Sequence, residues 1–407
     1  MISLEEAQGR VRAVADVLLE PENVPLPKSS GRRLAKDFHS DTPWPATDRS
    51  AMDGFGVRAG TEGLGAGTTL AVVGECLAGH PFVGAVGDGQ AIRIMTGAVV
   101  PNTVDSVVPV ENTSGYGGAQ VTLHSAVSKG LNIRPMGSEV AMGQLLLAAG
   151  TRIGAAEIGA LAVLGIDPVP VFRRPRVAIL ATGDEVIDIH RVPESHQVRN
   201  SNAHVLAAQV TEAGGEPLHL GIARDQEADL RQSLQTGLAE ADVLVSIGGV
   251  SKGTHDLVHR LLRELGVEEV FHGIQLKPGK PAFFGRVGGD APRFVFGLPG
   301  NPASCFTVFH LLVAPLLARI CGAPDPTAEE AAARAHVGGP PFRKNRRMQA
   351  IVGRLVLGEA GALSIALGSQ KPSGDPFALL GADAYGLVPP GSTPEATPLV
   401  QVLPFRP

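Results

Sequence analysis

The spacing of hydrophobic and polar positions divides the chain into stretches of different character. In residues 3–20 the apolar positions recur at helical spacing, starting with Leu4, Ala7 and Val11. Ser3 followed by Glu6 forms a capping box, so we predict an amphipathic helix there. From about 40 to 140 the apolar runs are short and broken by glycines, which predicts a small β domain. Its strands are expected at 69–73, 90–95, 106–110 and 120–123.

The second half of the chain alternates strands and helices. Residues 141–165 predict an apolar helical hairpin, and the prolines of 167–175 predict a stiff linker. Strands are then expected at 176–181, 218–223, 242–247, 270–274, 282–286 and 294–297. Between and after them we expect four helices. Two begin near Ser201 and Asp225, and the other two end near Leu265 and at Ile320. This alternation predicts a doubly wound, mostly parallel sheet. A Pro- and Ala-rich junction near 323–333 precedes short β segments, which predict a small C-terminal β domain.

The composition is that of a folded, loop-rich protein. A length of 407 residues suggests about two to four domains. The 44% hydrophobic content is enough to fill their cores, and the 51 Gly and 32 Pro indicate many loops. A net charge of -5 argues against binding to nucleic acid. The 3 Cys include no CxxC pair, which excludes a disulfide scaffold and a thiolate zinc site and favours the cytoplasm.

We expect no association with a membrane. The N-terminus, Met-Ile-Ser-Leu-Glu-Glu-Ala, is not that of a signal peptide. The longest apolar run, 308–320, contains His310, Pro315 and Arg319 and is too short to span a bilayer. The sequence therefore predicts a soluble protein.

The segment 47–57, Thr-Asp-Arg-Ser-Ala-Met-Asp-Gly-Phe-Gly-Val, places acids and a serine beside two glycines. It has too few apolar side chains for a core strand, so we predict a loop. Because glycine allows φ > 0 and a close backbone approach, such a loop can hold a cation or contact a ligand. An ordinary turn is the alternative.

Four polar glycine loops follow predicted strands of the doubly wound sheet. They are 182–185, 248–256, 277–281 and 298–302. Ligands of such sheets bind at the carboxyl ends of the strands, where helix N-termini attract anions. The loops therefore predict one ligand site.

The side chains of these loops indicate phosphate or oxyanion chemistry. Asp184, Glu185, Asp225 and Asp256 are carboxylates that repel one another when close. A converging set needs a cation, and all-oxygen ligands favour Mg²⁺ over zinc. Helix N-capping is the alternative for Asp225 and Asp256.

Lys277 and Lys280 flank a Pro-Gly turn, which can bring two ammonium groups to one small oxyanion. A solvated basic turn is the alternative here. With the acids, the lysines predict a metal-assisted site.

Other motifs disagree with the sequence. No GxGxxG follows a strand, which disfavours a dinucleotide dehydrogenase, and Gly279-Lys280 is followed by Pro281, which is not a P-loop. The run His255-Asp-Leu-Val-His259 imitates the HExxH helix but carries Asp256 where that mechanism needs Glu, which disfavours a zinc hydrolase. There is no GxSxG elbow.

The motifs resemble those of one family, the molybdopterin molybdenumtransferases of molybdenum cofactor biosynthesis, whose fold also forms the E domain of gephyrin. The matching segments occur in order over most of the chain and are Asp48–Phe55, Ile92–Ala98, Ala181–Glu185, Arg199–Asn202, Gly248–Gly253 with Asp256, Ile274–Pro281 and Gly297–Pro302.

The resemblance implies a multi-domain α/β protein with four domains. These are a helical elongated domain (1–40 and 141–172), an inserted β domain (41–140), an α/β molybdopterin-binding domain (173–325) and a small C-terminal β barrel (326–407). It also implies a homodimer whose site is completed across the interface. The implied reaction inserts molybdate into adenylylated molybdopterin, with Mg²⁺-assisted hydrolysis of the pyrophosphate and release of AMP. The preceding adenylylating enzyme and molybdoenzyme acceptors are the implied protein partners.

The resemblance also assigns residue roles. The catalytic set would be Asp53, Thr96, Glu185, Asp225 and Asp256, of which the last three would bind the metal. The pterin and oxyanion would be bound by Thr182, Gly183, Asp184, Gly248, Gly249, Ser251, Lys277, Lys280, Pro299, Gly300, Asn301, Pro302 and Ser304.

Some positions depart from the family pattern. Glu139 stands where Asp is common, which can shift a carboxylate by more than about 1 Å. The segments 343–347 and 370–374 match only loosely. A paralogue, a tungstate-preferring transferase and a non-catalytic pterin-binding or scaffold protein are the alternatives, although a scaffold has no need of the acids and lysines.

Overall fold

The chain forms two compact units. The computed structural model describes residues 1–15, 18–249, 257–289, 293–324, 334–338, 342–357, 363–367, 371–393 and 399–405. Unit 1 comprises Met1–Lys36, Ala149–Gly159 and Ile166–Pro407, and unit 2 comprises Asp37–Ala148 and Ala160–Gly165.

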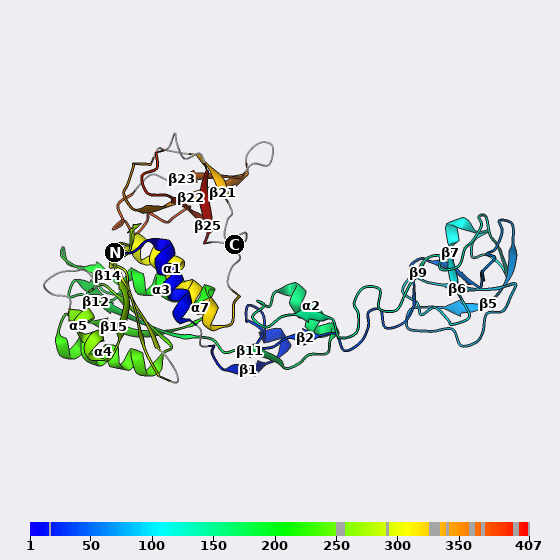
Figure 1. Cartoon of the computed structure of the whole chain (residues 1–407), viewed down its shortest axis with the longest axis horizontal. Helices are drawn as coiled ribbons and strands as arrows, with labels where there is room; N and C mark the ends of the chain where they lie inside the picture. The colour runs from blue at the N-terminus through cyan, green and yellow to red at the C-terminus, as the bar shows by residue number, and fades with distance from the viewer. Residues whose placement is uncertain are drawn as a thin grey trace. The chain divides into compact units, whose positions relative to one another are not determined.

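The centre of unit 1 is a six-stranded sheet (Figure 1). Its strands, in spatial order, are β15 (Glu216–Ala223), β12 (Arg176–Thr182), β16 (Val243–Ile247), β20 (Arg293–Leu298), β19 (Phe283–Val287) and β17 (Glu268–His272). The first four are parallel, whereas β19 is antiparallel to both β20 and β17. The predicted mostly parallel sheet is thus confirmed.

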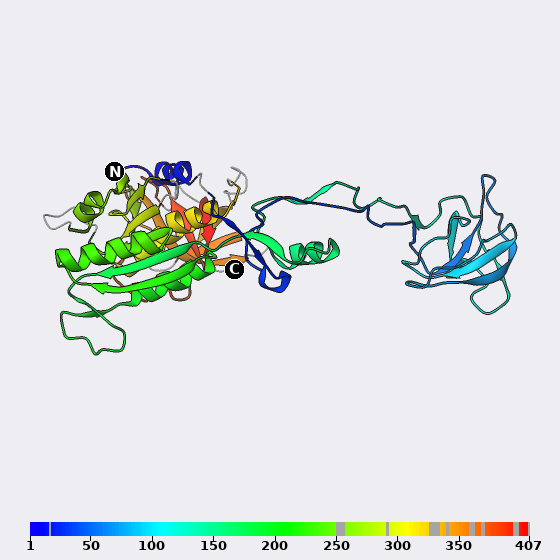
Figure 2. The same cartoon turned by 90° about the horizontal axis from the view of Figure 1, so that it is seen from below.

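Helices cover both faces of this sheet. One face is covered by α1 (Leu4–Val14), α3 (Ser201–Glu212) and a continuous helical run that consists of α6 (Pro302–Val308), η3 (Phe309–Val313) and α7 (Ala314–Ile320). These helices share a core with Val177 and Ile179 of β12. On the other face, α4 (Glu227–Glu240) and α5 (Leu257–Glu264) pack with Ala178 and Leu180. Because β12 is buried on both sides, its sequence is continuously apolar. In both views α1 lies beside α7 (Figures 1 and 2).

The helical run Pro302–Ile320 is long and apolar enough to cross a membrane, judged by length and composition alone. However, 67% of its apolar window is buried inside the protein. Phe309, Leu312 and Leu316 lie in the core beneath the sheet. This burial is that of a core helix.

The C-terminal strands of unit 1 close into a small barrel. The order is β18-β22-β23-β21-β25-β24, and a further pairing of β22 with β24 closes the sheet. The strands are β18 (Leu276–Lys277), β21 (Arg334–Gly338), β22 (Met348–Leu357), β23 (Leu363–Leu367), β24 (Ala384–Val388) and β25 (Leu399–Pro404). The expected C-terminal barrel is confirmed. The sequence did not predict β18, which leaves the α/β part and pairs with β22.

The segment 141–165 corrects one prediction. Only Ala155–Val163 is helical (α2), whereas Leu145–Leu147 is a strand (β10) that pairs with β2 (Phe38–His39), so the predicted helical hairpin is wrong. A short apolar run between glycines, here Gly143 and Gly150, fits a strand as well as a helix.

The predicted linker 167–175 also contains a strand. Its residues Val169–Phe172 form β11, which pairs with β1 (Pro21–Val24). Val169 and Val171 are fully buried. A short 3-10 helix, η1 (Leu26–Lys28), follows β1. The prolines therefore border a packed ladder, and the two chain segments that meet here support each other.

Unit 2 is built around a five-stranded sheet. Its order is β7 (Ser106–Pro109), β4 (Gly54–Val57), β6 (Gln90–Ile94), β5 (Thr69–Cys76) and β8 (Gln120–Thr122), and β3 (Arg49–Ser50) pairs separately with β9 (Ile133–Arg134). The 3-10 helix η2 (Val110–Asn112) follows β7. The four strands predicted for this region are β5, β6, β7 and β8.

Strand β4 corrects the prediction of a loop at 47–57. Its four residues are all buried, and it lies between β6 and β7. A Cβ on Gly54 would lie 1.9 Å from the carbonyl oxygen of Val108, and one on Gly56 would lie 3.1 Å from Val104. The glycines therefore allow neighbouring strands and side chains to pack closely, which a count of apolar side chains does not detect.

Candidate functional site

The predicted glycine loops leave from one edge of the unit 1 sheet. Strands β15, β12, β16 and β20 are parallel, and β17 runs in the same direction because it is antiparallel to β19, which is antiparallel to β20. The loops at 182–185, 277–281 and 298–302 therefore start at the same carboxyl edge, as does Asp225 after β15. Gly248 and Gly249 follow β16, whereas Ser251 and Asp256 lie outside the described residues.

Hydrogen bonds and close contacts join the loops that follow β12, β16 and β20. The Gly248 N–H donates to the Leu298 carbonyl over 2.9 Å, and the Thr182 hydroxyl donates to the Ile247 carbonyl over 3.0 Å. A Cβ on Gly248, whose φ is +87°, would lie 3.0 Å from the Thr182 hydroxyl. A Cβ on Gly300 would lie 4.0 Å from Gly248 Cα. The strand ends therefore form a continuous strip with little side-chain bulk.

The family-like segment Arg199–Asn202 positions this strip. Asn200 caps α3, because its side-chain oxygen accepts from the Ala203 N–H over 3.2 Å. Two residues further, the Asn202 amide donates to the Gly300 carbonyl over 2.7 Å. The start of α3 thus holds the loop at 298–302 in place.

Three carboxylates gather at the ends of β12 and β15. The backbone N–H of Asp225 donates to Asp184 Oδ1 over 3.3 Å. The pKa of Asp225 is raised, first by burial and then by the negative charges of Asp184 and Glu185. Among the described residues no basic side chain pairs with these carboxylates. A cation would relieve this repulsion, and an all-oxygen donor set fits Mg²⁺.

Asp225 does not cap a helix, so that alternative is wrong. Helix α4 begins at Glu227 and its N-cap residue is Gln226. The carboxylate that binds the backbone here belongs to Asp229, which accepts from the Arg224 N–H over 2.9 Å. The carboxylate of Asp225 is thus left for the acidic group.

Gly183 leaves space that the Glu185 side chain occupies. Its φ is +126°, and a Cβ there would lie 2.6 Å from Glu185 Oε2. The Glu185 carbonyl also accepts from the Val198 N–H over 2.9 Å. That bond lies beside the pairing of β13 (Val186–Ile187) with β14 (Val198–Arg199). The carboxylate therefore folds over a position where only glycine leaves room.

A cavity of about 760 Å³ lies between the lysine turn, the start of α6 and the C-terminal barrel. Basic side chains gather in its lining, and no acidic residue of the described chain lines it. The basic residues are Lys277, Lys280, Arg343, Arg347 and Lys371. Pro299, Asn301 and Ser304 also line it, and Pro302 begins α6 beside it. This volume suits a small-molecule ligand larger than a single oxyanion.

The lysine turn is packed against the protein. Gly279 has φ +119°, and a Cβ there would lie 2.7 Å from Val308 of α6. The Arg347 guanidinium donates to the Leu276 carbonyl over 3.1 Å, which ties the barrel to the turn. These contacts disfavour the alternative of a freely solvated basic loop.

Sequence reasoning missed three basic residues of the cavity. Arg343 and Arg347 lie in the segment 343–347 and Lys371 in 370–374, the two segments that depart from the family pattern. One indication of them was present in the sequence, because these segments contain basic residues where they depart from the family pattern. Their place beside Lys277 follows from the pairing of β18 with β22, which the sequence did not predict.

Asp53 and Thr96 meet in unit 2. Asp53 Oδ1 accepts from both the backbone N–H and the hydroxyl of Thr96, each over 2.7 Å. The backbone hydrogen bond, followed by the hydroxyl bond, lowers the pKa of Asp53. The two residues thus form one preorganised pair, in a different unit from Glu185.

Glu139, the departure from the family pattern in unit 2, forms an ion pair with Arg134 over 3.1 Å. Both side chains are about half exposed. An exposed pair of this kind contributes little stability.

Comparisons with known proteins agree with this architecture. Residues 2–165 match the family model "MoeA N-terminal region (domain I and II)", and residues 178–319 match "Probable molybdopterin binding domain". Two crystal structures of a molybdopterin biosynthesis MoeA protein from Pyrococcus horikoshii cover 100% of both chains, with a TM-score of 0.79 and 30% and 27% identity. The α/β part of unit 1 therefore has the fold of a molybdopterin-binding domain.

Curated relatives extend the match to a specific enzyme family. The molybdopterin molybdenumtransferase of Haemophilus influenzae is 32% identical over 79% of this chain and 78% of its own length. The molybdopterin molybdenumtransferase 1 of Mycobacterium tuberculosis is 33% identical over 82% of both chains. The chain belongs to the molybdopterin molybdenumtransferase family. It is an enzyme of molybdenum cofactor biosynthesis, which confirms the resemblance found in the sequence.

Proposed function

We propose that the enzyme inserts molybdate into adenylylated molybdopterin, with Mg²⁺-assisted hydrolysis of the pyrophosphate and release of AMP. The observation that carries this proposal is the separation of charge along one sheet edge. Asp184, Glu185 and Asp225 lie at the ends of β12 and β15, whereas the basic cavity lies at the opposite end of the strip, beside the turn after β18. The proposed substrate contains both a pyrophosphate and the site at which the metal is inserted. It therefore needs an acidic, Mg²⁺-binding environment for the first and a basic, oxyanion-binding environment for the second.

The acids have the chemistry to hold the metal ion. Glu185 and Asp225 would bind Mg²⁺, together with Asp256, which precedes α5 in the sequence, and Asp184 lies within the same group. When bound, the ion would offset negative charge on the pyrophosphate. Gly183 leaves room for the Glu185 carboxylate to lie over the loop, where it would be available to the ion.

The glycine strip and the cavity have the chemistry to hold the substrates. Thr182, Gly183, Gly248, Gly249 and Gly300 would bind the pterin. A Cβ on Gly183, Gly248 or Gly249 would lie within 3.0 Å of Glu185, Thr182 or Val258, so these glycines allow the strand ends to pack closely beside it. Lys277, Lys280 and Ser304 would hold the oxyanion, because ammonium and hydroxyl groups form charge-assisted hydrogen bonds to it. Pro299, Asn301 and Pro302 shape the loop between the strip and the cavity.

The enzyme should act as a homodimer in which Asp53 and Thr96 complete the site. They form a preorganised pair but lie in a unit without the acidic group and the lysine turn. The preceding adenylylating enzyme and molybdoenzyme acceptors are the protein partners that fit this place in cofactor synthesis, in the cytoplasm.

The test is AMP release by the purified enzyme. With adenylylated molybdopterin, molybdate and Mg²⁺, AMP should form in step with molybdenum cofactor, and omission of Mg²⁺ should stop it. Replacing molybdate with tungstate measures the preference between the two oxyanions. Tight binding of adenylylated molybdopterin without any AMP release would support a non-catalytic pterin-binding protein instead.

A further inference from the structure

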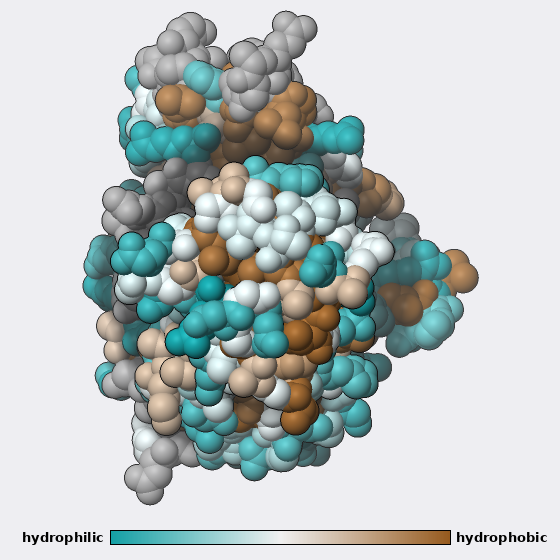
Figure 3. Space-filling model, turned by 90° about the vertical axis from the view of Figure 1, so that its right-hand side faces the viewer, coloured by the Kyte–Doolittle hydropathy of each residue, from teal (hydrophilic) through white to brown (hydrophobic). Residues whose placement is uncertain are grey.

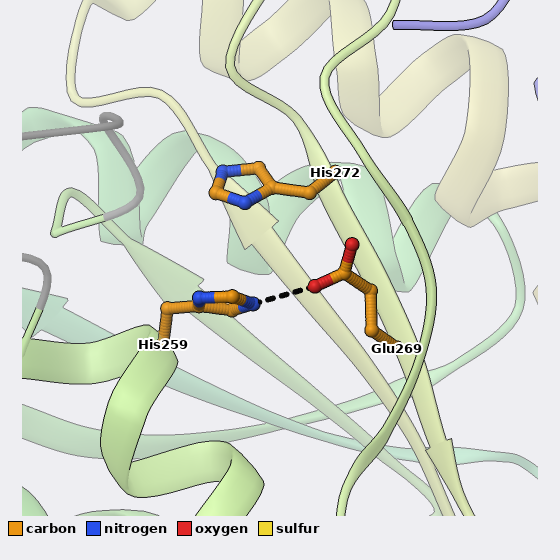
Figure 4. A group of neighbouring side chains, drawn as sticks. All are labelled: His259, Glu269 and His272. Atoms are coloured by element: carbon orange, nitrogen blue, oxygen red, sulfur yellow. Dashed lines mark hydrogen bonds and ion pairs between the residues drawn. The ribbon is translucent and has the colours of Figure 1, made fainter.

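Two histidines and a glutamate converge at the free edge of the unit 1 sheet, on its α4 and α5 face. His259 lies on α5, and Glu269 and His272 lie on the edge strand β17. Figure 4 shows the Glu269 carboxylate directed toward the His259 ring, with the His272 ring on the same side of the strand. These side chains belong neither to the acidic group nor to the lining of the basic cavity.

The donor atoms are close enough to share one ion. His259 Nε2 lies 2.7 Å from Glu269 Oε2, and one donor atom of each residue lies within 4.8 Å of the others. Metal–ligand distances of about 2.0–2.2 Å place the donors of a tetrahedral site roughly 3.4 Å apart. To reach this spacing, the widest separation must close by up to about 1.4 Å and the pair of His259 and Glu269 must open by about 0.7 Å, which side-chain rotation supplies.

A β-bulge places both strand residues on one face. Residues three apart on a regular strand point to opposite faces of the sheet. Here Glu269 pairs with Gly285 and Phe271 with Phe284, so Val270 is an extra residue between the two pairs. The added residue changes the alternation and brings Glu269 to the same face as His272. Bulges of this kind commonly re-aim a functional side chain.

The surroundings favour binding of a metal ion by the two imidazoles. Both histidine rings lie edge-on to Phe283, with centroid distances of 5.2 Å for His259 and 5.9 Å for His272. Phe283 is buried and excludes water on that side. Gly285 opposite Glu269 adds no side chain, and the Glu269 side chain is 41% exposed, so the outer side is open to an incoming ion.

Among the described residues, Arg263 is a neighbour that would have to move. The Arg263 guanidinium lies 3.4 Å from His259 Nδ1, a long contact made by an exposed side chain. An ion bound at Nε2 leaves the proton on Nδ1, so Arg263 would turn toward solvent. The guanidinium of Arg286 donates to Glu268 over 3.3 Å, and that of Arg10 donates to the Val270 carbonyl over 2.9 Å.

We propose that His259, Glu269 and His272 form a Zn²⁺ site that ties α5 to the edge strand β17. Two imidazole nitrogens and one carboxylate are a zinc-type donor set, with a fourth position left for water. Mg²⁺ prefers oxygen ligands, so the site differs in metal preference from the acidic group of Asp184, Glu185 and Asp225. The proposal is independent of the reaction that the enzyme catalyses.

The test is metal uptake by the full chain after removal of any affinity tag and treatment with a chelator. Zn²⁺ is titrated in excess Mg²⁺, which occupies oxygen-rich sites, and bound zinc is measured by calorimetry and by elemental analysis after dialysis. We expect about one zinc per chain and a rise in the melting temperature on binding. Co²⁺ should give the visible absorption of a four-coordinate ion.

Variants separate this site from adventitious binding. His259→Ala, His272→Ala and Glu269→Gln should each weaken zinc affinity by at least about tenfold. Glu269→Gln changes an exposed side chain, so its melting temperature without zinc should match that of the unaltered protein. His219→Ala is the control, because the His204 and His219 rings lie 5.9 Å apart on the exposed surface, and the described residues form no such three-residue group there.

Two results would overturn the proposal. One is the absence of stoichiometric zinc uptake, which would leave His259 and Glu269 as an ion pair only. The other is uptake that His259→Ala and Glu269→Gln leave unchanged while His219→Ala reduces it.

Discussion

The carboxylate of Asp225 lies beside two others, and this crowding has consequences for stability. Its pKa is raised by burial and by Asp184 and Glu185. When the pKa of an acid is higher in the folded than in the unfolded state, its contribution to stability is greatest at pH values below the pKa of the unfolded state. That contribution is lost as pH rises through the pKa of the folded state. At neutral pH without metal, the ionised Asp225 therefore destabilises the fold.

We predict that Asp225→Asn raises the melting temperature at pH 7 in Mg²⁺-free buffer. The gain should shrink as pH falls through the raised pKa of Asp225, because the native carboxyl then becomes protonated. Added Mg²⁺ should stabilise the unaltered protein more than the variant, because the ion relieves the same repulsion. Thermal unfolding across pH, with and without Mg²⁺, measures this. A lower melting temperature for Asp225→Asn at neutral pH without metal would contradict it.

The lysines of the cavity should act on the oxyanion. Lys280→Ala should raise the molybdate concentration required for half-maximal rate by about tenfold to a hundredfold, because one charge-assisted hydrogen bond contributes roughly 1.5–3 kcal/mol. The matched control is Lys344→Ala, an exposed lysine that does not line the cavity although Arg343 and Arg347 do. Equal molybdate dependence in both variants would show that the turn has no role in oxyanion binding.

At the scale of elements, the loop after β12 depends on one glycine. A Cβ on Gly183 would displace the Glu185 carboxylate, and its φ of +126° disfavours other residues. We predict that Gly183→Ala reduces AMP release by at least about a hundredfold, as loss of charge stabilisation in a metal-assisted site does.

The control for Gly183→Ala is Gly221→Ala on the neighbouring strand β15. Gly221 also has a positive φ, +86°, but a Cβ there meets nothing within 4 Å. It therefore adds the backbone strain without moving Glu185. Gly221→Ala should lower the melting temperature and keep the catalytic rate. Similar rates in the two variants would mean that Glu185 is not held by this contact.

The sequence predicted the elements whose side chains alternate regularly. Strand β12 was predicted for a different reason, because helices bury both of its faces and residues 177–181 are all apolar. Strands β5 and β6 mix apolar with polar residues. The sequence did not predict β4, where Gly54 and Gly56 permit close strand packing. In 141–165 a short apolar run gave no basis for choosing helix over strand.

The candidate site was predictable where each residue follows a strand in the sequence. Asp184, Glu185 and Asp225 follow their strands directly, so parallel pairing alone brings them to one edge. Arg347 and Lys371 reach the cavity only through the barrel and its pairing with β18, a long-range contact with no local pattern. Spacing cannot reveal such contacts.

At the scale of the whole molecule, exposed apolar surface supports a dimer. In α2, all of whose residues are described, only Leu161 is buried, and Val163 is 67% exposed. The face in Figure 3 carries apolar groups among the hydrophilic ones. A second copy of the chain can cover such surface. We predict a dimer in sedimentation at micromolar concentration, and a monomer alone would contradict this.

Mixing two inactive variants tests whether the site crosses the dimer interface. If Asp53 acts with Glu185 of the other subunit, a dimer of one Asp53→Ala chain and one Glu185→Gln chain retains one intact site. After exchange of subunits at a ratio of one to one, about half of the dimers are mixed, and each mixed dimer has one intact site of its two. The mixture should therefore regain about a quarter of the original activity. No recovery in mixed dimers, verified by native mass spectrometry, would place both residues in the same subunit's site.

The most direct test of the central claim is AMP release by Glu185→Gln measured across molybdate concentrations, with adenylylated molybdopterin and Mg²⁺ present. We predict that Glu185→Gln releases AMP at least about a hundredfold more slowly than the unaltered enzyme, although the pterin still binds. No concentration of molybdate should restore the rate. Lys280→Ala, measured beside it, should regain its rate at high molybdate. A Glu185→Gln rate that recovers with molybdate would contradict the assignment of the acids to the pyrophosphate and of the lysines to the oxyanion.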